Sequence, residues 1–258
     1  MRRCVRGGMA VLLGLAVGSG AAAQEPTDDW DFGEDPARKL SIAAVSFETF
    51  GVAVRCLDGR LSVLMSGLPV ATGERRLRYR MGETEISDAL WISGRNSPAA
   101  FAVWPRSVAA GMARGGPLSV SVPDGAVSRR IEVDLPASPN AVNRVFEACG
   151  ELLDPPPSDA PPSGESFAGF RWRSSPDVNF PGRTEASAGL AALTCVVRRG
   201  GRLGDCRVES EFPEGGGFGR AATFGTHRTA RVSPLNEAEG DGEGRRVSFL
   251  VRYASVGP

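Results

Sequence analysis

The sequence is poor in the residues on which most enzyme mechanisms depend. Among its 258 residues there is one histidine, His227, and one lysine, Lys39. Charge of one sign is also lacking, since 30 basic residues balance 30 acidic ones. A net charge of zero argues against a strongly basic nucleic-acid-binding protein. The composition therefore excludes most catalysis based on histidine or lysine. The balanced charge means that no nucleic-acid partner is expected.

Motifs for catalysis and nucleotide binding are missing too. No GxxxxGK[ST] segment exists, which excludes a P-loop, and no GxSxG segment marks a nucleophilic serine. Gly217–Ala222 fits GxGxxA, but Pro213 interrupts the approach and no buried parallel strand is expected there. His227 falls at a predicted helix end, where a surface position is usual. The sequence thus predicts no catalytic residue, no cofactor, no metal site and no enzyme.

Glycine, proline and apolar residues are plentiful instead. The chain has 33 glycines and 19 prolines, and 41% of its residues are hydrophobic. Glycine and proline favour turns and short strands over long helices, and the apolar share is sufficient for a packed core. The length fits one large or two modest domains. We expect an α+β protein of two domains.

The N-terminus has the pattern of a signal peptide over residues 1–23. A positively charged start precedes the apolar run Met9–Val17, and small residues follow up to Ala23. A membrane-spanning helix needs ~20 apolar residues, and this run is shorter. We expect cleavage near Ala23–Gln24 and a soluble periplasmic protein. Retention as a membrane anchor is the alternative.

Residues 24–38 form an acidic segment after the predicted cleavage site. Several carboxylates lie close together between Asp28 and Asp35. Calcium binding is one interpretation, but the carboxylates lack the ordered spacing of a calcium-binding loop. A solvated tail is the prediction that this spacing favours.

Four cysteines remain once Cys4 is removed with the signal peptide. An even number in an oxidising compartment predicts two disulfides with three possible pairings. A proline-rich stretch separates Cys56 and Cys149 from Cys195 and Cys206, so pairing within each half is expected. A zinc site is the alternative, but the cysteines lack CxxC spacing.

Residues 39–153 have the pattern of a mostly-β domain. Gly51–Leu57 and Leu61–Leu68 flank Asp58–Gly59, a strong hairpin turn. Further strands are predicted at Arg76–Arg80, Ala99–Trp104, Leu118–Val122 and Ile131–Leu135. Two helices are expected, at Ser107–Arg114 and at Pro139–Cys149, the second with Ser138 as its N-cap. We predict a sandwich-like domain covered by this C-terminal helix, with Cys149 meeting Cys56.

A proline-rich linker is expected over residues 154–169. Asp154–Gly164 reads DPPPSDAPPSG, and proline favours an extended conformation with nothing to bury. At ~3.1 Å per residue such a segment spans a few tens of ångströms. It can space two domains but cannot cross a periplasm.

Residues 170–258 contain a β-hairpin that carries two cysteines. Leu190–Val197 and Leu203–Ser210 surround Gly200–Gly201, and a two-residue turn there pairs position i with position 401 − i. Cys195 then lies opposite Cys206, within disulfide range. Successive side chains of a strand point to opposite faces, so the side chains of the hairpin divide into an apolar set and a polar set. The apolar face has Leu193, Cys195, Val197, Cys206 and Val208, and the solvent face has Thr194, Arg198, Asp205, Arg207 and Glu209.

A helix and a final strand complete this domain. Gly219–His227 is expected to be helical, because small and apolar residues recur at helical spacing. Apolar and polar residues alternate along Arg246–Tyr253, which predicts a strand. Its side chains expected to face the core are Val247, Phe249, Val251 and Tyr253. Hairpin, helix and strand together predict a three-stranded antiparallel sheet with one covered face.

The order of these motifs resembles the C-terminal domain of TonB proteins, over roughly residues 172–253. Phe180-Pro181 near Ala186 comes first, and Val232-Ser233-Pro234 precedes the closing strand. The strand and helix positions that match are Gly201, Leu203, Val208, Ser210, Ala221 and Ala222. The whole chain is also similar to a loosely defined set of exported bacterial proteins that join a disulfide-bearing β domain to a TonB-like C-terminal domain.

The resemblance implies protein binding rather than catalysis. In that family the final strand recruits an extended peptide from an outer-membrane transporter by strand addition. The implied partner here is an envelope protein of that kind, and membrane contact would occur through partners alone. The implied docking strand consists of Arg246, Val247, Ser248, Phe249, Leu250, Val251, Arg252 and Tyr253.

The chain also departs from the family. TonB proteins transmit inner-membrane energy through an N-terminal anchor and a long proline-rich span. This linker is too short, and the N-terminal segment has the pattern of a cleavable signal. A genuine TonB-type energy transducer, anchored by an uncleaved N-terminal segment, is therefore the alternative.

Overall fold

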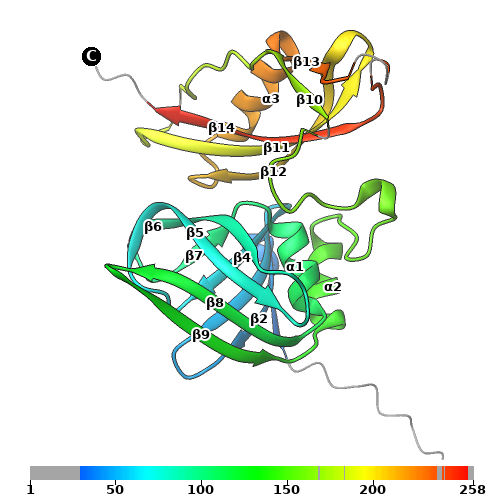
Figure 1. The fold of residues 1–258 in the computed structure, drawn as a ribbon. Coiled ribbons are helices and arrows are strands. Elements are labelled where there is room, and N and C mark those ends of the chain that lie inside the picture. The colour runs from blue at the N-terminus through cyan, green and yellow to red at the C-terminus, as the bar shows by residue number, and fades with distance from the viewer. Residues whose placement is uncertain (1–29, 168, 183, 237–239, 241, 255–258) are drawn as a thin grey trace, which may run out of the picture.

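The computed structural model describes residues 30–254, apart from residues 168, 183, 237–239 and 241. The predicted signal peptide and residues 24–29 of the predicted tail lie outside the described residues. The described chain folds around two antiparallel sheets, one in residues 30–153 (the N-terminal half) and one in residues 170–254 (the C-terminal half). The two halves lie against each other (Figure 1).

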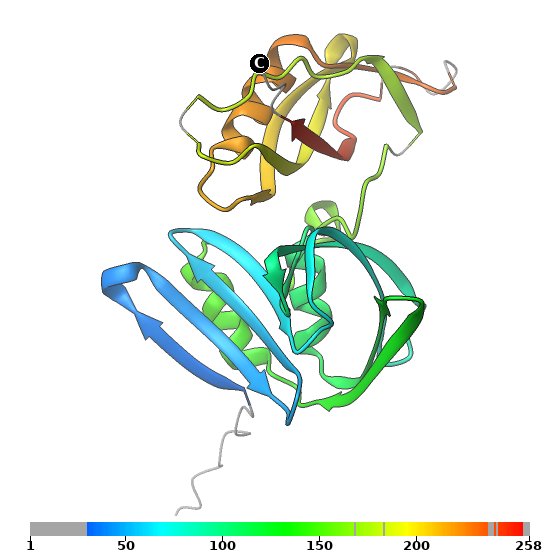
Figure 2. The same ribbon diagram turned by 90° about the vertical axis from the view of Figure 1, so that its left-hand side faces the viewer.

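The N-terminal half is built on one curved sheet. Its described residues form nine strands in the order β1-β2-β3-β4-β7-β6-β5-β8-β9, which curve into a half-barrel (Figure 2). The strands are β1 (Asp31–Asp35), β2 (Leu40–Ser46), β3 (Gly51–Leu57), β4 (Arg60–Ser66), β5 (Ala71–Met81), β6 (Ser87–Ser97), β7 (Ala100–Ala102), β8 (Gly116–Asp124) and β9 (Val127–Leu135). The predicted sandwich is wrong, because the curvature of one twisted sheet, rather than a second sheet, encloses the core.

Helices cover this sheet close to their predicted positions. α1 (Pro105–Ala113) packs on β4, and α2 (Pro139–Ala148) packs on β2 and β3. Ser138 occupies the N-cap position of α2 as predicted, although its hydroxyl makes no capping hydrogen bond. The apolar face of α2 is buried in the core of the half-barrel.

The described fold of the N-terminal half begins at Trp30, before the predicted domain start at Lys39. Residues 31–35, assigned above to the acidic tail, form β1 and pair with β2. Trp30 is 3% exposed, and its Nε1 donates a hydrogen bond to the backbone oxygen of Pro136 at 2.8 Å. β1 is an edge strand, and edge strands often carry charge. Its acidic composition therefore resembles that of a tail.

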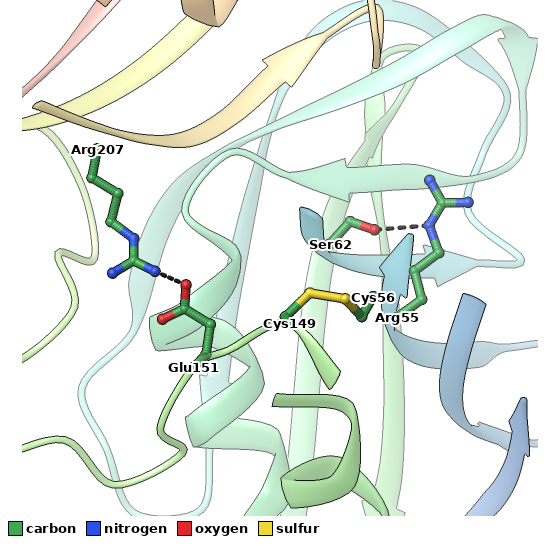
Figure 3. The surroundings of a disulfide bond; sticks show 6 residues. All are labelled: Arg55, Cys56, Ser62, Cys149, Glu151 and Arg207. Carbon is green, nitrogen blue, oxygen red and sulfur yellow. Dashed lines mark hydrogen bonds and ion pairs between the residues drawn. A yellow bond between two sulfur atoms is a disulfide. The ribbon is translucent and has the colours of Figure 1, made fainter. Parts of the chain in front are cut away.

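Both predicted disulfides are confirmed. Cys56 of β3 bonds to Cys149, the residue that follows α2, and the two Cα atoms are 5.6 Å apart (Figure 3). Cys195 bonds to Cys206 within the C-terminal hairpin. Disulfides persist in oxidising compartments, so the pair of bonds indicates an extracytoplasmic location.

The C-terminal half is built on a second antiparallel sheet. Its described residues form five strands in the order β10-β13-β12-β11-β14. They are β10 (Phe170–Ser174), β11 (Ala188–Arg198), β12 (Arg202–Phe212), β13 (Arg231–Pro234) and β14 (Arg246–Ala254), with α3 (Phe218–Thr229) on one face. The predicted hairpin, helix and last strand are confirmed, but the predicted number of strands is wrong. β10 and β13 were missed because each is too short to show alternation.

The β11–β12 hairpin differs from its predicted register. The turn has three residues, Arg199–Gly201, instead of two, so position i pairs with 400 − i beside the turn. Further along, Asp205 and Cys206 both lie opposite Cys195, and Asp205 has a positive φ of 45°. This bulge adds one residue to β12. It therefore restores the predicted meeting of Cys195 with Cys206 in spite of the longer turn.

Candidate functional site

β14, the predicted docking strand, lies at one edge of the C-terminal sheet, where β11 is its neighbouring strand. Successive side chains of a strand point to opposite faces. One set faces the core beneath α3 and is buried, as alternation predicted: Val247, Phe249, Val251 and Tyr253. The predicted docking residues thus form one regular edge strand.

The end of β14 is attached to α3 through Tyr253. Its hydroxyl donates a hydrogen bond to the backbone oxygen of Phe218 at 3.1 Å, and the centroids of the two rings are 5.0 Å apart. Burial, with a further contribution from the Glu211 carboxylate, raises the pKa of Tyr253 well above its ordinary value. The phenol therefore remains a neutral donor. Phe180, from the Phe-Pro motif, packs edge-on against both rings.

The outer edge of β14 has two sections, and the first, Arg246–Leu250, is occupied by the chain itself. Hydrogen bonds alternate along an antiparallel strand. Arg245, directly before β14, accepts a backbone hydrogen bond from Val197 of β11 at 2.8 Å, so the even-numbered residues of β14 direct their backbone groups away from β11. Ser248 exchanges two backbone hydrogen bonds with Ser166, of 2.7 and 2.8 Å. The N–H of Leu250 donates to Glu165 Oε1 at 3.0 Å.

The second section, from Arg252 to Ala254, is open. Both of these residues are exposed, and among the described residues no backbone hydrogen bond reaches their outward groups. The Arg252 guanidinium donates to both carboxylate oxygens of Glu74 on β5, at 2.8 and 3.1 Å. This hydrogen bonding raises the pKa of Arg252. Its side chain is thus held against the N-terminal half, while its outward backbone groups have no hydrogen-bond partner among the described residues.

The face of the C-terminal sheet opposite α3 packs on the N-terminal half (Figure 1). An apolar cluster spans the contact and consists of Leu90, Ile92, Val103, Trp104, Leu190, Ala192, Phe212 and Leu250. The prediction that the polar face of the hairpin meets solvent is wrong for Thr194 and Glu209, which are 6% and 7% exposed. Alternation distinguishes two faces of a strand but does not reveal what covers the second one.

A buried ion pair crosses this contact. Arg106 of α1 donates from Nε and Nη2 to the two carboxylate oxygens of Glu209, at 2.9 and 2.7 Å. The two side chains are 10% and 1% exposed. Glu209 is the extra residue of a second bulge in β12, directly after Val208. Bulges redirect side chains, and this one directs the carboxylate toward α1.

Two other ion pairs join the two halves. Arg55 pairs with Glu214. Arg207 pairs with Glu151, two residues beyond the disulfide-bonded Cys149 (Figure 3). Burial lowers the pKa of the Arg207 guanidinium. Sequence reasoning missed all of these pairs, because a charged residue carries no local signal of a distant partner.

A cleft of about 1440 Å³ lies between the two halves. Ile92, Phe101 and Phe212 contribute apolar surface to it. Arg252 and Ala254 also line it, so the open section of β14 borders the cleft. The N-terminal half thereby forms the wall of the cleft opposite the end of β14.

The described residues contain no group of three or more histidine, cysteine or acidic side chains that could hold a metal ion. His227, the single histidine, is exposed in the last turn of α3. The candidate functional site is the open section of β14 beside the cleft.

Comparison of the chain with protein-family models, with curated proteins and with solved structures finds no match. No helix in the described ranges has the length and apolar character needed to span a membrane. A fold alone does not define a function, so the function of this chain depends on the geometry of its site.

Proposed function

We propose that this chain is a periplasmic, non-enzymatic binding protein whose β14 edge accepts an extended segment of an envelope protein. The observation that carries the proposal is the open section of β14, where Arg252 and Ala254 are exposed and no described residue bonds their outward backbone groups. Strand addition draws affinity from main-chain hydrogen bonds and needs no catalytic group. The TonB-like order of motifs favours an outer-membrane transporter as the partner.

The N-terminal half would provide a second contact for the same partner. A strand that pairs with Arg252 and Ala254 would lie beside the cleft, which residues of β5 and β6 also line. The buried Arg106–Glu209 pair holds the two walls of the cleft together. Main-chain pairing then supplies affinity, and the cleft supplies selectivity for side chains.

An Arg252→Pro variant tests strand addition. Proline removes the outward N–H of residue 252 and leaves the inward bonds of its neighbours to β11 in place. A photo-crosslinking residue at position 254 should then recover about tenfold less partner from intact cells, which corresponds to a loss of ~1.4 kcal/mol.

Arg252→Ala is the matched control, because it loses the contact with Glu74 but keeps the N–H. We expect it to recover partner within about threefold of wild type. Circular dichroism establishes that both variants are folded. Undiminished recovery by the folded proline variant would contradict docking at this edge.

The mass of the native protein tests export separately. We expect a mature N-terminus at Gln24, because small residues precede it at the end of the predicted signal peptide. A mass that includes residues 1–23 would instead favour the alternative, a TonB-type energy transducer anchored by an uncleaved N-terminal segment.

A further inference from the structure

The linker covers the first section of the β14 edge. Residues 159–166, which we call the strap, lie alongside it. Besides the hydrogen bonds of Glu165 and Ser166 described above, the carbonyl oxygen of Ala160 accepts from Arg246 Nη2 at 3.1 Å. The strap therefore bonds the same outward backbone groups that an added strand would use.

Polar contacts, rather than packing, attach the strap. None of its residues is buried, and Pro161 and Pro162 have no N–H to donate. Ser166 is its one residue in a two-way backbone pair, whereas β11 pairs with β14 from Ala254 to Arg246. Exposed hydrogen bonds and ion pairs contribute little because water competes for the same groups. The strap can therefore leave while the sheet stays folded.

Both ends of the strap are anchored. The ring of Phe167 lies 4.9 Å from that of Trp172 and 6.4 Å from that of Phe249. Before the strap, Leu153 packs against the core of the N-terminal half and so fixes the chain six residues upstream of Asp159. A segment tethered at both ends returns to its site at a high effective concentration. It therefore competes strongly even though its contacts are few.

We propose that the strap is an internal competitor of the partner strand. The partner, an extended polypeptide segment, enters at the open section of β14 and displaces the strap to pair along the whole strand. This inference rests on the proposed function. The open section is shorter than a usual strand of about five residues, so pairing there alone gives few main-chain bonds. The strap thus lowers affinity and selects segments that can pair along the full edge.

Amide hydrogen exchange of the full mature protein, measured by NMR, tests whether the strap detaches on its own. The outward amides of Ser248 and Leu250 should exchange about tenfold or more faster than the inward amides of Phe249 and Val251, because local opening exposes the outward ones alone. Equal exchange of all four amides would mean that the strap leaves only when the sheet unfolds. That result would overturn the proposal whatever the partner is.

A Glu165→Ala/Ser166→Pro variant tests the competition. Alanine removes the acceptor for the Leu250 amide, and proline removes the donor to the Ser248 oxygen. The probe is the envelope protein that the wild-type chain captures through a photo-crosslinking residue at position 254. Mass spectrometry identifies it. We expect the double variant to recover it about threefold or more strongly, since a weaker competitor leaves the edge free more often.

Ser163→Pro is the matched control, because it places proline at another exposed strap residue. It should recover the partner as wild type does. Unchanged recovery by the Glu165→Ala/Ser166→Pro variant contradicts only the proposal that the strap competes with the partner. Undiminished recovery by Arg252→Pro contradicts the proposed function, so the two failures are distinguishable.

Discussion

The Glu209→Ala variant should unfold with a free energy about 3–5 kcal/mol below that of wild type. The substitution leaves the Arg106 guanidinium buried without its carboxylate, and an unpaired buried charge is costly. Both hydrogen bonds, of 2.7 and 2.9 Å, are lost together. Urea unfolding followed by tryptophan fluorescence measures the effect, and Trp104 reports directly because it lies in the same contact between the halves.

Two variants are controls for the buried pair. Arg106→Met/Glu209→Leu removes both charges while it keeps apolar volume, and it should lie within about 2 kcal/mol of wild type. Arg76→Ala breaks an exposed pair with Asp88, so it should leave unfolding unchanged. A Glu209→Ala protein as stable as Arg76→Ala would show that the contact between the halves does not depend on the ion pair.

Loss of the Cys56–Cys149 disulfide should cost about 4–5 kcal/mol, and loss of Cys195–Cys206 about 3 kcal/mol. The bonded residues are separated by 93 and 11 positions respectively. A crosslink restricts the unfolded chain more strongly when it closes a longer loop. The double cysteine-to-alanine variants, compared by urea unfolding under identical conditions, measure both losses.

The order of the two losses is the decisive result. A larger loss from the short-loop pair would contradict the loop-closure explanation. It would instead assign the stabilisation to packing around Cys195, which is fully buried in the C-terminal core. Cys56 is also buried, so alanine leaves a small cavity in both variants and their comparison remains fair.

Local signals were sufficient to predict most individual elements. β3 begins and ends where its apolar run does, at Gly51–Leu57, and Asp58–Gly59 forms the turn after it. Pro139 begins α2 as predicted. Alternation placed the inward residues of β14 correctly. Each of these features depends on the backbone and hydropathy preferences of neighbouring residues, so a sequence reveals them without knowledge of the fold.

Pairing between distant segments was not predictable in the same way. β4 pairs with β7, and β5 pairs with β8, across intervening strands. At the candidate site, the motif order indicated β14 as the docking strand, but nothing near Glu165 or Ser166 in the sequence indicated that they bond to it. The contact of Arg252 with Glu74 joins residues 178 positions apart, and such a partner leaves no periodic pattern.

The sequence by itself determined the helices and the inward face of β14, because capping and alternation act over a few residues, and the proline-rich stretch between the cysteines indicated which of them pair. Only the tertiary structure decided what covers the polar face of the C-terminal hairpin. Glu209 has the pattern of a solvated residue, yet Arg106, 103 positions away, makes its burial possible. Whether a charge is buried depends on where its counter-ion lies in space, and that location is a property of the folded chain alone.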